Sequence, residues 1–543
     1  MKKNYFRFVA YAAIATSLVF AACNKDDDNN GDATEKIVPP KTDNEALALA
    51  NAVYGPIQTL SSSYSFLLES ATETTVSFEE RDDSKDGPQV SILETVPSNW
   101  YPIKVFSRLY QSIGAANLAI DRISASELKD SVKNLLTARA RFIRGYDYFQ
   151  LVQIFGEVPL ILSVDAGELD RTTRKSIDDI YASVVKDLTD AAAKLPQYDQ
   201  KKSNPTQLAA KAILAKLYLT WGQKPLTQAE VEAIKSSKTD PAKPAPDNTK
   251  LQQALTYANE VINSNKYQLL PDFNNIWGVG NENNGEVIFS IHHDGDNIDA
   301  QGNHQTHCGY TWPKDERADP HISFADISYE NAIADGDARK LYSYVTSVEF
   351  KDGNIDTLTW PLSIVRPGKW IHRSAEGTNL ALDNQPNNID HIDFRLGEIY
   401  LIKAEAQWFL NDGDKGLAAL NTLRKRAGVD ELQSVSVNSL YDEWANELAF
   451  EQKHWLNLVR WRTLILSILT KVPAYEYYKA AYNNADQFKA LPGAIANRFA
   501  FYKRIYKHLH AKVDNIDGHF YRFPIPLGEK SNDLGIRPQN PGY

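Results

Sequence analysis

The stretch from Ala138 to Pro159 constrains the fold more than any other part of the chain, because it carries an unbroken helical period. Its small and apolar residues recur at spacings of three and four, which places one set on a single face of an α-helix: Ala138, Phe142, Gly145, Phe149, Val152 and Gly156. The opposite side is polar, with Arg139, Asp147, Gln150 and Gln153. The pattern therefore predicts a long amphipathic helix.

Two glycines and a proline refine this prediction. Gly145 on the apolar face costs about 1 kcal/mol relative to alanine, so we expect a neighbouring helix to approach closely there. Gly156 and then Pro159 predict the end of the helix, because glycine accepts a left-handed C-cap and proline cannot continue a helix.

Composition narrows the function more than the fold. The 543 residues are 43% hydrophobic and 24% charged, as in ordinary globular proteins. The net charge of −10 argues against a nucleic-acid partner, because a phosphate backbone requires a basic face. There are two cysteines, Cys23 and Cys308. With Cys23 processed as described next, Cys308 has no intramolecular partner, and the core must come from helix packing.

The first residues predict an export signal. Lys2, Lys3 and Arg7 precede the apolar run Phe8–Phe20, which is too short to span a membrane. The run ends in Phe-Ala-Ala-Cys, which predicts a lipoprotein signal peptide over residues 1–22 and lipidation of Cys23; a plain secretory signal is the alternative. Residues 23–40 are predicted to form an acidic flexible tether.

Helical periods predict paired helices on both sides of a long irregular section. In the N-terminal half the expected helices are 43–54, 103–123, 176–195, 208–221 and 251–262, with irregular structure over 64–98. The Lys/Pro/Asp-rich insertion 223–250 is expected to be exposed and mobile. In the C-terminal half we expect a strand at 286–291, a buried Trp277, and a helical hairpin at 393–410 and 415–427. Residues 292–392 lack helical period, and long loops on a rigid scaffold often carry function.

Known catalytic and metal motifs are absent from the sequence. There is no G-x-S-x-G, H-E-x-x-H or P-loop. His292, His293, His304 and His307 make a zinc site conceivable, although no helical pattern or cysteine pair supports it. The oxygen-rich run from Asp294 to Asp299 breaks the EF-hand pattern. We expect no catalytic residues, no metal and no cofactor.

Several motifs together resemble one family. The signature Arg-Phe-Ile-Arg-Gly-Tyr-Asp-Tyr-Phe…Phe-Gly-Glu-Val-Pro, the hairpin at 393–427 and the terminal segment Phe523–Tyr543 are similar to the SusD/RagB family of lipid-anchored outer-membrane nutrient-binding proteins. Tyr110, Ile113 and Asn117 also match its Y-x-x-I-x-x-x-N. The chain departs from the family where Gln452, His454 and Asn457 replace the usual Gly, Arg and Asp.

The resemblance implies a fold class and a domain organisation. It implies a mainly α protein of tetratricopeptide-like helical hairpins, with a large irregular loop-rich section and a few short strands. Residues 41–270 would form an N-terminal helical region. Residues 271–543 would form a C-terminal region that includes ligand loops at 292–392.

A binding function follows from the same resemblance. Sugars present an apolar ring face and a rim of hydroxyls, so a glycan site requires exposed aromatic rings beside Arg, Asp, Asn or Gln. Two irregular stretches offer such residues: Arg81, Asp82, Asn99, Trp100 and Tyr101 in the first, and His307, Tyr310 and Trp312 in the second. The family implies an oligosaccharide ligand, a SusC-like TonB-dependent transporter as partner, and a lipid (palmitate) anchor in the outer membrane, facing the extracellular medium. The alternatives are a peptide-binding RagB-like protein, a surface glycoside hydrolase, and a repeat protein that only scaffolds a complex.

Overall fold

The computed structural model describes residues 38–76, 86–278, 280–293, 389–472, 507–528 and 533–543, together with short pieces between 325 and 380. Within these ranges the fold is mainly α-helical, and one hydrophobic core runs from Ala46 to Ile536. No helix in this described part is long and apolar enough to cross a membrane.

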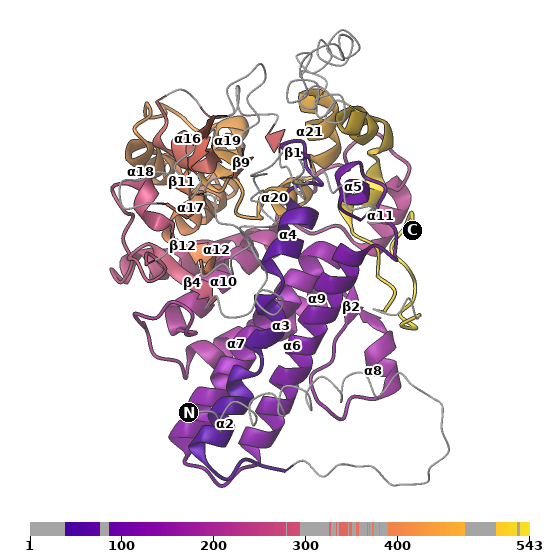
Figure 1. The fold of residues 1–543 in the computed structure, drawn as a ribbon, viewed down its shortest axis with the longest axis vertical. Helices are drawn as coiled ribbons and strands as arrows, with labels where there is room; N and C mark the ends of the chain where they lie inside the picture. The colour runs from indigo at the N-terminus through magenta and orange to yellow at the C-terminus, as the bar shows by residue number, and fades with distance from the viewer. Residues whose placement is uncertain are drawn as a thin grey trace.

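The N-terminal half is a stack of antiparallel helices (Figure 1). In chain order these are α2 (Asp43–Asn51), α3 (Tyr54–Gln58), α4 (Ser61–Leu68), α5 (Asp86–Ser91), α6 (Trp100–Ser124), α7 (Asp130–Phe155), α8 (Glu168–Thr172), α9 (Ile177–Ala192), α10 (Gln207–Gly222), α11 (Gln228–Ile234) and α12 (Asn248–Asn263). Helices α6, α7, α9, α10 and α12 pack on one another in turn. This confirms the expected helical hairpins. The prediction of irregular structure over 64–98 was wrong in part, because α4 and α5 lie there.

The C-terminal half continues the stack and adds a two-stranded ribbon. Strand β4 (Val287–Ile291) pairs antiparallel with β12 (His391–Arg395), and α17 (Leu396–Leu410) follows directly and packs on α12. The other described helices of this half are η2 (Phe273–Ile276), α16 (Ala338–Ser343), α18 (Leu417–Ala427), α19 (Val437–Glu447), α20 (His454–Trp461), α21 (Leu464–Lys471), a helix at 507–515 and the 3₁₀ turn η5 (Gly518–Tyr521). Residues 393–395, predicted as helix, belong to β12. Trp277 is 3% exposed, as predicted.

Helix α7 is central rather than amphipathic. Almost every side chain from Leu136 to Phe155 is buried, including Arg144, Asp147 and Gln150. Arg144 forms a bidentate ion pair with Asp187 of α9 and also donates to the Asn117 side chain of α6. The prediction of an amphipathic helix was therefore wrong, since α6 and α9 pack on α7 and supply partners for Arg144.

The structure confirms the close helix approach at Gly145 and the end of α7 at Gly156, but Gly156 has ψ −133° and is therefore not the left-handed helical cap that was predicted. A Cβ at Gly145 would lie 3.1 Å from Leu188 Cγ, so α9 approaches closely at this position. Gly156 is the C-cap of α7 with φ +77°, and a Cβ there would lie 2.6 Å from Arg522 Nε. Both glycines therefore make room for side chains from distant parts of the sequence.

The insertion 223–250 is docked rather than loose. It contains α11, whose Thr227 and Glu230 form a reciprocal capping box. Asp240 accepts hydrogen bonds from the backbone N–H groups of Ile465 and Leu466 at 2.8 and 2.9 Å. The prediction of a mobile insertion was wrong, because its charged residues bind the start of α21.

Candidate functional site

Two segments that the sequence places far apart meet in a short ribbon. Strand β1 (Thr75–Val76) pairs antiparallel with β5 (Ala325–Asp326), with Val76 opposite Ala325. The last residue of β1 therefore lies opposite the first residue of β5. The structure thus brings together the roots of the two stretches in which the sequence predicts ligand contacts.

The start of α6 is hydrogen-bonded to Asp86, which follows the predicted ligand contacts Arg81 and Asp82 in the chain. Asn99 is the N-cap of α6, and its side-chain amide donates to the Asp86 carbonyl oxygen and to the Gln89 side chain. The Trp100 backbone N–H donates to the Asp86 carboxylate at 3.1 Å. These bonds fix the first turn of α6 against α5.

The three predicted site residues in this turn have different surroundings. Asn99 is fully buried and its polar atoms serve the cap. Tyr101 is 7% exposed and stacks on Phe66, with ring centroids 4.1 Å apart. Trp100 is 45% exposed. The geometry gives Asn99 and Tyr101 structural roles, so of the three only Trp100 presents its ring to solvent.

A cavity of about 450 Å³ lies beside this turn. Pro97 and Ser98 form one wall and the terminal segment forms the other, with Ile525, Pro526, Leu527, Asp533, Leu534, Ile536, Arg537, Gln539 and Tyr543. The Leu527 N–H donates to the Pro97 carbonyl oxygen at 2.9 Å, which holds the two walls together. Since Trp100 is two positions after Ser98, their Cα atoms are at most about 7 Å apart.

The cavity combines apolar walls with a charged pair at its edge. Asp533 and Arg537 form an exposed bidentate ion pair, and hydrogen bonding from Arg537 lowers the pKa of Asp533. Sequence reasoning missed these residues. Their only signal was that they belong to the family-like terminal segment, which is not typical of a binding loop.

The remaining predicted contacts lie outside the described residues: Arg81, Asp82, His307, Tyr310 and Trp312, together with Cys23. Of the histidines considered for zinc, two are described. His292 Nδ1 lies 2.8 Å from Asp390, and His293 Nε2 lies 3.0 Å from the Gln58 carbonyl oxygen. In the part of the chain that the structure describes, no three His, Cys, Asp or Glu side chains form a metal-binding group.

A cluster of three glutamates among the described residues is internal and paired with arginine. Arg395 binds Glu286, Glu447 and Glu451, and all four side chains are nearly or wholly buried. Burial alone would raise the pKa of Glu447, but Arg426, Arg395 and Arg339 outweigh it and hold this pKa well below its usual value. A glycosidase acid requires a raised pKa and contact with substrate. This cluster therefore serves the fold.

Asp147 has the opposite character. It lies on α7 with no exposure, and neither carboxyl oxygen has a hydrogen-bond partner among the described residues. Burial raises the pKa of Asp147 well above its usual value, and the Ser112 hydroxyl offsets part of this rise. The same hydroxyl donates to the Val53 carbonyl oxygen. Asp147 is therefore a buried core carboxyl whose neutral form is favoured by burial.

This burial predicts a pH-dependent stability. Above the pKa of the unfolded chain, about 3.9, the folded state retains a proton that the unfolded state has lost, so stability falls as pH rises toward the folded pKa. We expect Asp147→Asn to raise the Tm at pH 7 by about 3 °C or more, and by much less at pH 4. Thermal unfolding at both pH values measures this. Asp187→Asn is the matched control and should lower the Tm, because Asp187 is paired with Arg144. An equal gain at both pH values would contradict the prediction.

Two family models match the chain. Residues 45–219 match a model described as "Starch-binding associating with outer membrane", and residues 293–543 match the SusD family. A curated relative, "SusD-like protein P2" of Formosa agariphila, is 27% identical over 65% of this chain and 70% of its own length. "Starch-binding protein SusD" of Bacteroides thetaiotaomicron is 25% identical over 70% of this chain and 73% of its own.

Solved structures share the fold. A SusD homologue from Bacteroides thetaiotaomicron has a TM-score of 0.69 at 18% identity, over 94% of this chain and 99% of its own. Surface glycan-binding protein A of the same species, solved with laminarihexaose, has a TM-score of 0.66 at 17% identity, over 92% and 100%. The two family models together span most of the sequence, and the helical stack agrees with them. The chain belongs to the SusD family.

Proposed function

We propose that this protein binds glycan oligosaccharides at the surface formed by Trp100 and the adjoining cavity, without altering them. The observation that carries the proposal is the exposed Trp100 ring, fixed at the first turn of α6 next to a cavity of about 450 Å³. A tryptophan face accommodates the apolar side of a pyranose ring, and the Asp533–Arg537 pair offers partners for hydroxyls. Relatives solved with laminarihexaose and with a xylogluco-oligosaccharide support this ligand class.

The remaining predicted residues extend this proposal. Arg81 and Asp82 precede Asp86 in the chain, and His307, Tyr310 and Trp312 precede β5. We propose that these side chains complete the site around the β1–β5 ribbon. The family also supports delivery of the glycan to a SusC-like TonB-dependent transporter by a protein held in the outer membrane through Cys23.

Removal of the Trp100 ring tests the site. We expect Trp100→Ala to weaken binding of laminarihexaose or of a xylogluco-oligosaccharide about tenfold or more, because an exposed aromatic anchor supplies much of the energy of a shallow site. Isothermal titration calorimetry measures the affinity. Trp100→Phe should retain most of it, and Leu169→Ala, at a side chain that is 74% exposed, should retain all of it.

Two outcomes would contradict the proposal. One is unchanged glycan affinity in Trp100→Ala. The other is hydrolysis of the oligosaccharide by the wild-type chain. Binding of extended peptides by a wild-type chain that binds no glycan would instead favour the RagB-like alternative.

A further inference from the structure

Lys512 is a buried cation that binds backbone rather than a carboxylate. It lies on the helix at 507–515 and has no exposed surface. Its ammonium group donates to the carbonyl oxygens of Ser70 and Thr72 at 2.6 and 2.7 Å and to that of Thr75. All three acceptors lie on the few residues that lead from α4 into β1.

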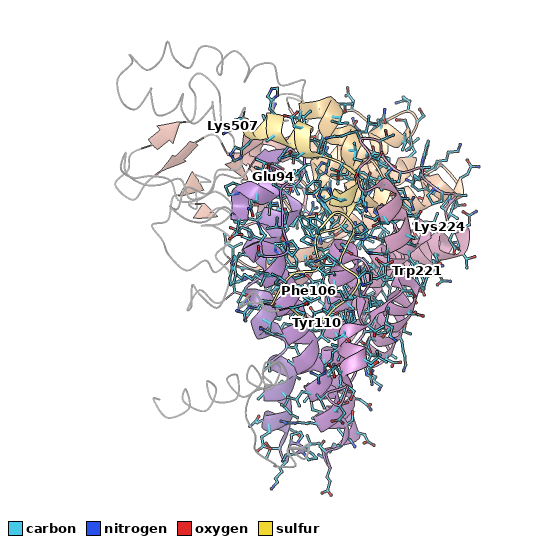
Figure 2. The ribbon with its side chains drawn as sticks, turned by 90° about the vertical axis from the view of Figure 1, so that its right-hand side faces the viewer. Glu94, Phe106, Tyr110, Trp221, Lys224 and Lys507 are labelled. Carbon is cyan, nitrogen blue, oxygen red and sulfur yellow. The ribbon has the colours of Figure 1, made fainter. Side chains whose placement is uncertain are left out.

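The same helix also binds the other root of the early stretch. Asn515, three residues after Lys512, donates to the Ile92 carbonyl oxygen at 2.8 Å and to the Glu94 side chain. These acceptors lie just after α5. Figure 2 labels Lys507 of this helix and Glu94, both in the upper part of the view. One helix therefore holds the chain both before residue 77 and after residue 85.

Side chains of the segment that leads into β1 are bound by the neighbouring helices. Glu73 is fully buried and contacts His454 of α20 and Lys471 of α21, at 2.9 and 3.1 Å. The Glu69 carboxylate accepts the Gln452 backbone N–H at 2.6 Å. These two carboxylates thus fix the segment against the C-terminal helices.

We propose that Lys512 is a positioning residue that holds β1 in register with β5, so that both predicted ligand stretches start from a fixed base. The ammonium group supplies three donors, one each to the carbonyl oxygens of Ser70, Thr72 and Thr75. The effect on β1 is independent of ligand identity. Only its effect on glycan affinity rests on the proposed function.

The positive charge of Lys512 strengthens its hydrogen bonds to this segment. Burial lowers the pKa of Lys512 to about 7, and the Glu73 carboxylate offsets part of this effect. Glu73 is the acid that faces Lys512; His454 and Lys471 face Glu73 from α20 and α21. Above the pKa the amine has two N–H donors for three acceptors and no charge, so its hold on the segment weakens.

Hydrogen–deuterium exchange on the full chain tests the proposal. We expect Lys512→Met to lower the protection of the Thr75 and Val76 amides about tenfold or more, because charge-assisted hydrogen bonds to the segment are lost, while α7 amides keep their protection. Lys507→Met, the same change at an exposed lysine on the same helix, should leave both unchanged. Unchanged exchange in β1, or an equal rise across β1 and α7, overturns the proposal.

A second measurement needs no variant. In the wild-type chain, protection of the β1 amides relative to α7, corrected for the intrinsic rate, should be lower at pH 9 than at pH 6. A constant ratio overturns the proposal even where Lys512→Met fails to fold. Calorimetry with laminarihexaose then adds the functional arm: Lys512→Met should weaken binding while Lys507→Met does not. If the wild-type chain binds no glycan, the proposed function fails and the exchange result still decides the role of Lys512.

Discussion

Arg395→Met is expected to lower the Tm by about 3–5 °C and to reduce the soluble yield. Arg395 ends β12 and contributes five hydrogen bonds to Glu286, Glu447 and Glu451. Methionine has a similar length but no charge, so it leaves buried carboxylates with fewer cationic partners. Removal of one member of a buried ion network typically costs about 3–5 kcal/mol. For a chain of this length each kcal/mol shifts the Tm by about 1 °C, because the entropy of unfolding grows with the number of residues.

The matched control is Arg424→Met. Arg424 belongs to the edge of the same network, where it contacts Glu443 at 3.1 Å, and its side chain is 21% exposed. Glu443 keeps the buried Arg339 as a partner. We therefore expect a Tm decrease of about 1 °C or less, since a partly solvated ion pair contributes about 1 kcal/mol or less. Equal losses in the two variants would show that burial does not determine the cost.

The helical stack could be predicted from the sequence because its period is local. Ser176, for example, caps α9 as the pattern indicates, and its side chain accepts the Asp179 N–H at 3.1 Å. The burial of α7 could not be predicted in the same way. Arg144 can be buried because Asp187 and Asn117, from other helices, supply its hydrogen-bond partners. Such partners appear only after the chain has folded.

The candidate site shows the same limit. The sequence placed Trp100 and Tyr101 together in one aromatic pair. On a helix, adjacent residues point in directions about 100° apart, so Trp100 faces solvent while Tyr101 stacks on Phe66 in the core. The meeting of β1 with β5 and the contacts of Lys512 join segments that are remote in sequence, and neither leaves a signal in local composition.

Packing of the insertion 223–250 requires a glycine at position 518, which no helical pattern in the sequence indicates. Gly518 opens η5 directly beneath the end of α11. A Cβ at this position would lie 2.0 Å from the Ile234 carbonyl oxygen and 2.6 Å from its carbon. The His519 N–H then donates to the Lys235 carbonyl oxygen at 3.1 Å, which continues the contact by one residue. The close approach is therefore between two backbones, and a side chain cannot rotate away to relieve it.

We expect Gly518→Ala to separate α11 from η5, to lower the Tm by several degrees, and to expose the 228–242 segment to proteolysis. The loss follows from overpacking against backbone, which typically costs about 1–3 kcal/mol or more. Limited proteolysis with mass spectrometry would locate the cleavage.

Gly55→Ala is the matched control, because a Cβ at Gly55 meets nothing within 4 Å and the residue lies in α3. That change should raise stability by about 0.4–1 kcal/mol through the unfolded chain. Wild-type resistance to protease in Gly518→Ala would mean that Asp240 and its contacts with α21 hold the insertion without help from α11.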